Sequence, residues 1–301
     1  MEIKSFDELI AKVKAAPTIR AAIASAADLH TLEAAVHAHK EGIIEPVFIG
    51  DKNKIEELLS SIGLVHERYD IIDEPDILQT SHVASKMVNA GKADIVVKGF
   101  IDTSDFLRGI LDKEHGLRTG NPMSHIAFLQ VPGYKKLLAI TDGGMVTAPD
   151  YQGKVQLVEN AVAILRGMGY ECPKVAAVTA VEKPNKAMPE TLDAQMLQEE
   201  NKKGIIKNCI IEGPVSYDIV MSRESAQNKG FTGKHSEDYD ILLMPNISAG
   251  NIMSKALMYN AGAKMSGLVA GAKVPLVLNS RSSSAEEKFY AIVLAAASRL
   301  Y

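Results

Sequence analysis

Short apolar runs alternate with stretches of helical length along nearly the whole chain. The runs predict strands at residues 19–24, 46–49, 70–72, 93–98, 125–130, 137–141, 174–179, 209–211, 240–244, 267–269 and 274–278. The stretches between most of them predict helices, for example at residues 29–40, 75–90, 153–167 and 189–203. Strands that alternate with helices form mostly parallel sheets with helices on both faces. We therefore predict an α/β fold in which ligands bind where the strands end.

The length of 301 residues predicts two domains, because a single core rarely grows beyond roughly 250–300 residues. The alternation breaks at "SHIAFLQVPGYKKLLAIT", which has the pattern of an antiparallel pair of strands joined by a Pro-Gly turn. The final apolar helix begins at a capping pattern of Ser283 and Glu286, and we expect it to return to the first domain. The prediction is a first domain of residues 1–120 with 280–301, a second of 121–279, and a cleft between them.

The composition is that of an ordinary globular protein, with 47% hydrophobic residues and a net charge of −4. This charge gives no electrostatic footprint for nucleic acid or an anionic membrane, so any anion must be bound by local groups. No apolar run approaches the ~20 residues that span a bilayer, and the N-terminus lacks the apolar core of a signal peptide. Cys172 and Cys209 match no metal or redox spacing. These features predict a cytoplasmic protein with reduced, buried thiols.

The familiar nucleotide and metal motifs are absent from the sequence. No GxGxxG follows a strand, and "GFTGKH" is too short for a P-loop. The acidic residues form no dense cluster of the metal-ligand type. Instead, three turns that follow predicted strands are rich in small hydroxyl residues, Gly and Asn, and each of these segments carries a basic residue.

The first of these turns is "VVKGFIDTSDFLRGIL", after the predicted strand 93–98. A helix that begins near Thr103 offers free backbone N–H groups to an anion, and Arg108 lies about one and a half turns further on. The second is "LLMPNISAGNIMSKAL", and the third is "NSRSSSAEE". Helix N-caps use the same residue types, and an arginine also pairs with carboxylates, so each turn has a structural interpretation too. Together they favour a site for an anionic small molecule, such as a phosphorylated or CoA-type ligand.

The turns belong to a set of six blocks that resemble the phosphate acyltransferases, and the phosphate butyryltransferase branch more than phosphate acetyltransferase. The blocks are "ADIVVKGFIDTSDFLRGIL", "GLRTGNPMSHIA", "KPNKAMPETLDAQML", "IIEGPVSYDIVMS", "DYDILLMPNISAGNIMSKAL" and "VPLVLNSRSSSAEEK". They cover nearly the whole chain in the same order. The resemblance implies an enzyme that interconverts a short-chain acyl-CoA plus phosphate with acyl phosphate plus CoA, without a metal or redox cofactor. It also implies two α/β domains related to the isocitrate and isopropylmalate dehydrogenases, with the site in their cleft, and a homo-oligomer.

The resemblance also implies roles for individual residues. Ser280 would orient the CoA thiol or stabilise the developing charge, and Arg281 would contact phosphate, which a planar guanidinium suits. Arg108, in the "T-x-x-x-L-R" block that starts at Thr103, would be a second phosphate ligand. The residues expected to line the CoA or phosphate side are Asn246, Gly250 and Asn251. Two further residues lie in a block typical of the butyryl branch, Arg118 as a phosphate contact and His125 as a possible strand-end histidine.

The base that accepts the thiol proton is less clearly marked. The acetyltransferases carry an aspartate seven positions after the serine, where this chain has Glu287. The butyryltransferase pattern S-R-A-D-S has an aspartate where this chain has Ser283. Glu287 is therefore the predicted base, with Glu286 and Asp142 as alternatives.

Two other functions are compatible with the same architecture. One is an NAD-dependent dehydrogenase, which would need a nucleotide-binding pattern and a set of metal-binding carboxylates. The other is a non-catalytic protein that binds CoA or acyl phosphate, which the altered position of Ser283 favours slightly. Turnover without NAD or metal distinguishes the acyltransferase from both.

Overall fold

The structure is a computed structural model that describes residues 2–64, 69–281 and 283–301. These residues group into two compact units. Unit 1 comprises residues 2–8, 122–265 and 301, and unit 2 comprises the described parts of 9–121 and 266–300. The domain boundaries proposed from the sequence stay a prediction.

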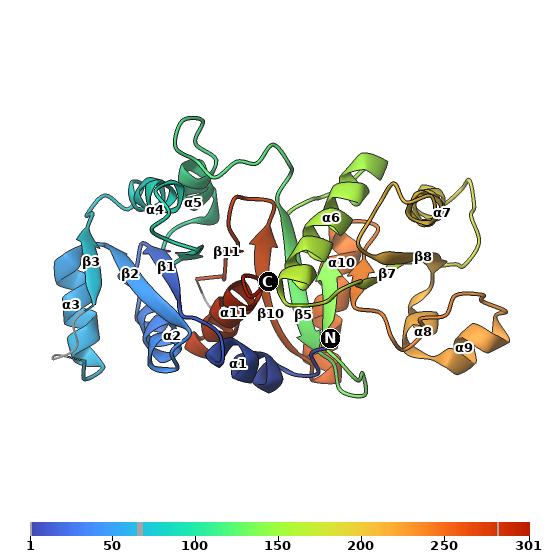
Figure 1. The fold of residues 1–301 in the computed structure, drawn as a ribbon, viewed down its shortest axis with the longest axis horizontal. Coiled ribbons are helices and arrows are strands. Elements are labelled where there is room, and N and C mark those ends of the chain that lie inside the picture. The colour runs from blue at the N-terminus through green and yellow to red at the C-terminus, as the bar shows by residue number, and fades with distance from the viewer. Residues whose placement is uncertain (1, 65–68, 282) are drawn as a thin grey trace. The chain divides into compact units, whose positions relative to one another are not determined.

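Unit 2 is built on a sheet with the strand order β3-β2-β1-β4-β11-β10 (Figure 1). Its strands are β1 (Ile19–Ala24), β2 (Ile44–Gly50), β3 (Asp70–Asp73), β4 (Ile95–Lys98), β10 (Lys264–Ala270, from the unit boundary onward) and β11 (Leu276–Val277). The strands from β3 to β11 are parallel, and β10 runs antiparallel to β11. All four residues of β4 are buried, as expected for a strand covered on both faces.

Four of the helices of unit 2 form two packed pairs (Figure 1). The helices are α1 (Phe6–Lys14, from the unit boundary onward), α2 (Leu29–Lys40), α3 (Lys52–Ser61), α4 (Thr80–Asn89), α5 (Thr103–Ile110) and α11 (Ala285–Ala297). Helix α2 packs against α11, and α4 packs against α5, on different sides of the strands. The Phe289 ring of α11 stacks on His37 of α2 with ring centroids 4.1 Å apart. The C-terminal helix is therefore part of the core of unit 2.

Unit 1 has a sheet with the order β5-β6-β9-β7-β8. Its strands are β5 (Ser124–Gln130), β6 (Leu138–Thr141), β7 (Lys174–Val178), β8 (Ile210–Val215) and β9 (Ile241–Leu243). Its helices are α6 (Tyr151–Gly167), α7 (Pro189–Lys202), α8 (Tyr217–Met221), α9 (Arg223–Asn228) and α10 (Ile247–Ala261). Strands β6, β9, β7 and β8 are parallel, and β5 is antiparallel to β6. The antiparallel pair predicted around the Pro-Gly turn is thereby confirmed.

Each strand predicted from the sequence is present, although several ends differ. The strand predicted at 274–278 is reduced to Leu276–Val277. The helix predicted from residue 75 begins at Thr80, because the Asp76 carboxylate accepts the N–H of Leu78 and holds a turn there. The mixed α/β class with mostly parallel strands is confirmed.

Two smaller predictions are wrong. The cap of the last helix is Ser284 with Glu287, one residue later than the predicted pair of Ser283 and Glu286. The sequence "SSSAEE" contains the S-x-x-E spacing in both registers, and the second is used. Cys209 is buried as expected, but Cys172 is exposed. No helix of the described ranges is long and apolar enough to cross a membrane.

Candidate functional site

Two of the three predicted turns lie side by side in unit 2. Strands β4 and β11 are neighbours and parallel, with Val96 opposite Leu276 and Val97 opposite Val277. The segments that follow β4 and β11 therefore leave the sheet at the same edge. The turn after β4 leads into α5, and the turn after β11 leads to α11.

Arg281 contacts two residues of the turn after β4, Asp102 and Phe100. Its Nη2 atom is 2.9 Å from Oδ1 of Asp102, and its guanidinium carbon is 5.8 Å from the centre of the Phe100 ring. The two charged side chains are 51% and 56% exposed. An exposed pair of this kind contributes only about 0–1 kcal/mol. A ligand anion can therefore replace the carboxylate at little cost. Ser280 is exposed beside it, and Ser282 lies outside the described residues.

Among the residues that the structure describes, no side chain caps the N-terminus of α5. Asp102 is the N-cap residue, a type that normally accepts a hydrogen bond from the first turn, but its carboxylate makes no such bond. It pairs with Arg281 instead. The first N–H groups of a helix have no acceptor within the helix and carry partial positive charge. The end of α5 at Thr103, which is exposed, is therefore suited to an anion.

Lys98, which the sequence analysis did not single out, ends β4 beneath this turn. It is only 2% exposed. Its Nζ donates to the carbonyl oxygens of Ile101 at 2.9 Å and Gly99 at 3.3 Å. Its signal in the sequence is a lysine that closes the apolar run "DIVVK" just before a glycine.

Charged groups of both signs surround Lys98. Burial lowers the pKa of Lys98 to about 8, and the neighbouring Lys288 and Arg281 add to this effect, against Asp102 and Asp28. Lys288 has its own partner, since its Nζ lies 2.6 Å from Oδ2 of Asp28. Burial opposes ionisation of Asp28, but its bonds to Lys288 and to the helix α2 outweigh this and hold the pKa of Asp28 below its ordinary value.

The two other predicted arginines have different surroundings. Arg108 is exposed on α5, with Nη1 2.8 Å from Oδ1 of Asp105 one turn earlier. Arg118 is exposed, and its backbone forms an antiparallel bridge with Ala272. Both belong to unit 2. Among the described contacts, neither Arg108 nor Arg118 forms an ion pair with Asp102 of the turn after β4.

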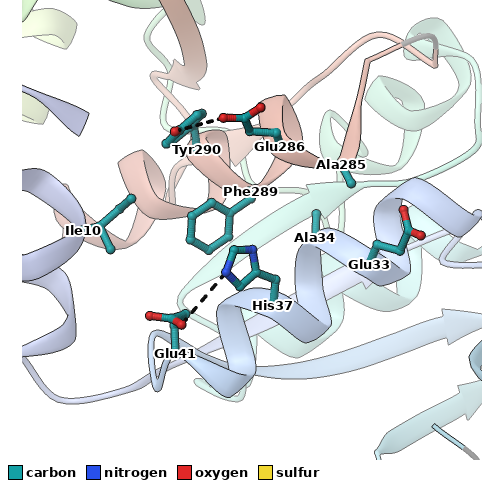
Figure 2. A pocket seen from close by; sticks show the side chains of 9 residues that line it. All are labelled: Ile10, Glu33, Ala34, His37, Glu41, Ala285, Glu286, Phe289 and Tyr290. Carbon is teal, nitrogen blue, oxygen red and sulfur yellow. Dashed lines mark hydrogen bonds and ion pairs between the residues drawn. The ribbon is translucent and has the colours of Figure 1, made fainter. Parts of the chain in front are cut away.

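The two candidate glutamates of α11 are engaged differently. Oε2 of Glu287 accepts the N–H of Ser284 at 2.9 Å, which leaves Oε1 without a donor among the described residues. Glu286 accepts the Tyr290 hydroxyl at 3.1 Å and lines a cavity of about 490 Å³ between α1, α2 and α11. Figure 2 shows Glu286 among the side chains that line this cavity, together with the stacked His37 and Phe289 rings. Glu286 thus faces the helix layer of unit 2.

The third predicted turn lies in unit 1, against the turn after β6. Gly250 packs directly on the backbone there, since a Cβ atom at Gly250 would lie 2.5 Å from the carbonyl oxygen of Asp142 and 2.9 Å from Cα of Gly143. Nδ2 of Asn251 donates to the Gly143 carbonyl at 3.0 Å. Asn246 caps α10 by accepting the Ala249 N–H. Gly250 and Asn251 therefore hold the "TDGGM" turn against the start of α10.

Asp142 is part of the same turn and is only 2% exposed. Its Oδ1 accepts the N–H groups of Gly144 and Met145, and its Oδ2 accepts that of His125. The carboxylate is thus occupied with backbone donors, which suits a structural role better than proton transfer. His125, also at this edge, has a buried Nδ1 atom without a partner among the described residues. Burial lowers the pKa of His125, and the nearby Asp142 opposes that shift.

We expect Gly250→Ala to destabilise the protein by about 2–4 kcal/mol, because the new methyl group must displace backbone atoms of the β6 turn. The measurement is the free energy of unfolding in urea. Ser248→Ala, on an exposed position of the same helix, is the control and should change it by less than about 0.5 kcal/mol. Equal stability of both variants would contradict the close packing.

Unit 2 also has a cavity beside Phe100. A cavity of about 190 Å³ lies among the loops that follow β1, β2, β3 and β4. Phe100 is half exposed and forms part of its wall, and its ring is the same one that Arg281 overlies. Among the described residues, no group of three or more His, Cys, Asp and Glu side chains is arranged to hold a metal ion.

Known proteins resemble this chain over almost its full length. Residues 74–296 match the family described as "Phosphate acetyl/butaryl transferase". The chain is 42% identical to the phosphate butyryltransferase of Clostridium acetobutylicum over 98% of both chains. It is 39% identical to the phosphate acetyltransferase of Thermotoga maritima, over 91% of this chain and 93% of the other. Its structure is similar to that of a branched-chain phosphotransacylase from Enterococcus faecalis V583, with a TM-score of 0.81, 28% identity, and coverage of 93% and 99% of the two chains.

Proposed function

The chain belongs to the phosphate acetyl/butaryl transferase family and is a phosphate acyltransferase, and we propose that it acts on a short-chain acyl-CoA such as butyryl-CoA. The reaction exchanges CoA for inorganic phosphate and gives acyl phosphate and free CoA. The similarity to two phosphate butyryltransferases, of which one is 42% and one 41% identical, supports the butyryl group. The proposed reaction uses no metal or redox cofactor, since the acyl group moves between two nucleophiles.

The observation that carries the proposal is the position of Arg281 at the N-terminus of α5, where the Asp102 carboxylate pairs with the guanidinium and does not cap the helix. In the proposed mechanism, phosphate replaces the Asp102 carboxylate on the guanidinium, which offers paired N–H donors to two phosphate oxygens. The N–H groups that follow Thr103 add further donors. Both features hold the phosphate in one orientation without a water shell.

The proposed chemistry is one displacement at the acyl carbon. In the direction of CoA acylation, the thiolate attacks the carbonyl of the acyl phosphate, the carbon–oxygen bond to phosphate breaks, and phosphate leaves on Arg281. Glu287 accepts the thiol proton through its Oε1 atom, because Oε2 is held by the cap of α11. The hydroxyl of Ser280, an exposed residue, orients the thiol or stabilises the oxyanion.

The other proposed ligands remain predictions. They are Arg108 and Arg118 for phosphate and Asn246, Gly250 and Asn251 for CoA or phosphate. The dehydrogenase-like arrangement of two domains around a cleft, the homo-oligomer and the cytoplasmic location also stay predictions.

Release of free thiol tests the proposed function. We expect butyryl-CoA to yield free CoA only when phosphate is added, with EDTA present and without NAD, as measured with a thiol reagent. Arsenate in place of phosphate should also release CoA, since the acyl arsenate that forms is a mixed anhydride that water hydrolyses. Binding of butyryl-CoA without phosphate-dependent release would indicate a non-catalytic binding protein. A requirement for NAD or a divalent metal would contradict the proposal.

A further inference from the structure

Among the residues that the structure describes, the buried cation Lys98 has no anionic partner. The described ranges provide two carbonyl oxygens for its three N–H donors, those of Gly99 and Ile101, and no carboxylate in ion-pairing distance. Burying a charge is costly unless it is paired. The other buried lysine of this region, Lys288, does have a carboxylate on Asp28. The unpaired charge of Lys98 therefore points to an anion that comes from outside the chain.

The contacts of Lys98 lead directly to Arg281. Its two acceptors flank Phe100, whose ring lies under the Arg281 guanidinium. The second acceptor, Ile101, precedes Asp102, which pairs with the same guanidinium. One ammonium group thus fixes the short turn that carries both contacts of Arg281 and the start of α5.

We propose that Lys98 is a positioning residue for phosphate: it clamps the 99–102 turn under Arg281 and supplies a buried positive charge that the bound anion neutralises. This inference rests on the proposed function, which gives Arg281 its ligand. It assigns Lys98 no contact with the reacting atoms. Lys98 thereby adds a positive charge to the two other positive groups of the proposed phosphate site, the Arg281 guanidinium and the N-terminus of α5.

The charge of Lys98 makes phosphate binding depend on pH. Burial lowers the pKa of Lys98 to about 8, with Lys288 and Arg281 contributing and Asp102 and Asp28 opposing. A bound phosphate favours the protonated form, so the affinity for phosphate should fall as the pH rises above 8 and the free protein loses this proton. Below that pH the lysine is charged in both states, and this dependence disappears.

The experiment measures KM for phosphate between pH 6.5 and 9.5 at saturating butyryl-CoA. In the parent protein we expect KM to rise about fivefold to tenfold from pH 8 to 9. Lys98→Arg, which stays charged throughout, should have a KM that is flat above pH 8. Lys98→Met should already have a KM raised about tenfold at pH 7. The ionisation of phosphate itself affects all variants equally and cancels in the comparison.

Two further measurements separate positioning from general stability. The KM for CoA should change less than twofold in both variants. Lys98→Met should add little to the defect of Arg281→Ala, since the two act on one ligand. Lys154→Met is the control, because Lys154 is also a buried lysine but belongs to unit 1 and pairs with Asp193. It should keep the parental pH dependence of KM for phosphate.

The outcomes are distinguishable. If phosphate-dependent CoA release is absent from the parent protein, the proposed function fails. If release occurs but Lys98→Arg follows the parental pH profile, the role of Lys98 is overturned while the function stands. If Lys98→Met does not fold, the pH profile of Lys98→Arg still decides.

Discussion

Replacing Arg281 with alanine is expected to lower kcat/KM for phosphate by about a hundredfold to a thousandfold. The substitution removes the paired donors that face the phosphate at the end of α5 and leaves the Asp102 carboxylate without its counter-ion. That carboxylate then repels the phosphate dianion. The KM for CoA should change little, because the guanidinium is assigned to phosphate alone. Initial rates of thiol release, with phosphate varied at saturating butyryl-CoA, measure the effect.

The chain offers a closely matched control in Arg20. Its Nη2 atom lies 3.2 Å from Oδ2 of Asp70, and this pair is also exposed and also belongs to unit 2. It lies near the start of β1, away from the edge where the strands end. Arg20→Ala should keep parental kinetics. Arg281→Lys should recover part of the loss, because lysine restores the charge but not the planar fork. Equal kinetics for Arg281→Ala and the parent protein would show that phosphate does not bind to Arg281.

The strands were predictable because burial on two faces leaves apolar runs in the sequence. The run "DIVVK" before the turn of Lys98 is one example, and β4 is indeed buried throughout. The turns after β4 and β11 were also predictable, because the residue types that favour turns, Gly, Ser, Thr and Asn, are concentrated there. These two patterns together placed Ser280 and Arg281 just after a buried strand.

The contacts of the site were not predictable, because they depend on which strands are neighbours. The sequence does not state that β11 pairs with β4, and only this pairing brings Arg281 to Asp102 and Phe100. Asp102 alone looks like an ordinary helix N-cap. Lys98 alone looks like the solvated end of a strand, although it is buried.

The same limit applies in unit 1. The two glycine-containing segments "TDGGM" and "SAGN" are far apart in the sequence, and neither shows that Gly143 and Gly250 touch. Their contact follows from the parallel pairing of β6 with β9. Asp142 likewise looks like a possible base from its sequence alone, whereas its three backbone donors become visible only in the folded turn.

Glu287→Gln is expected to lower kcat for CoA acylation by about a hundredfold without loss of stability. Glutamine preserves the cap of α11, because its amide oxygen can accept the N–H of Ser284 as the carboxylate does. It cannot accept the thiol proton. The measurement is the rate of butyryl-CoA formation from butyryl phosphate and CoA, together with urea unfolding of each variant.

Two neighbouring substitutions separate the cap from the base. Ser284→Ala removes the acceptor of the Glu287 N–H and should cost about 1 kcal/mol of stability while activity persists. Glu286→Gln, which changes a carboxylate that faces Tyr290, should change neither quantity appreciably.

The pH dependence of the Glu287→Gln defect identifies its cause. The thiol of CoA ionises by itself as the pH rises toward its own pKa, and the thiolate then needs no base. The defect in kcat should therefore narrow as the pH approaches 9.5, whereas a misplaced α11 would leave it constant. A variant with parental kcat at pH 7 would exclude Glu287 as the base. Since Asp142 is occupied by backbone donors and Glu286 faces the helix layer, the proton would then pass to solvent water rather than to either of them.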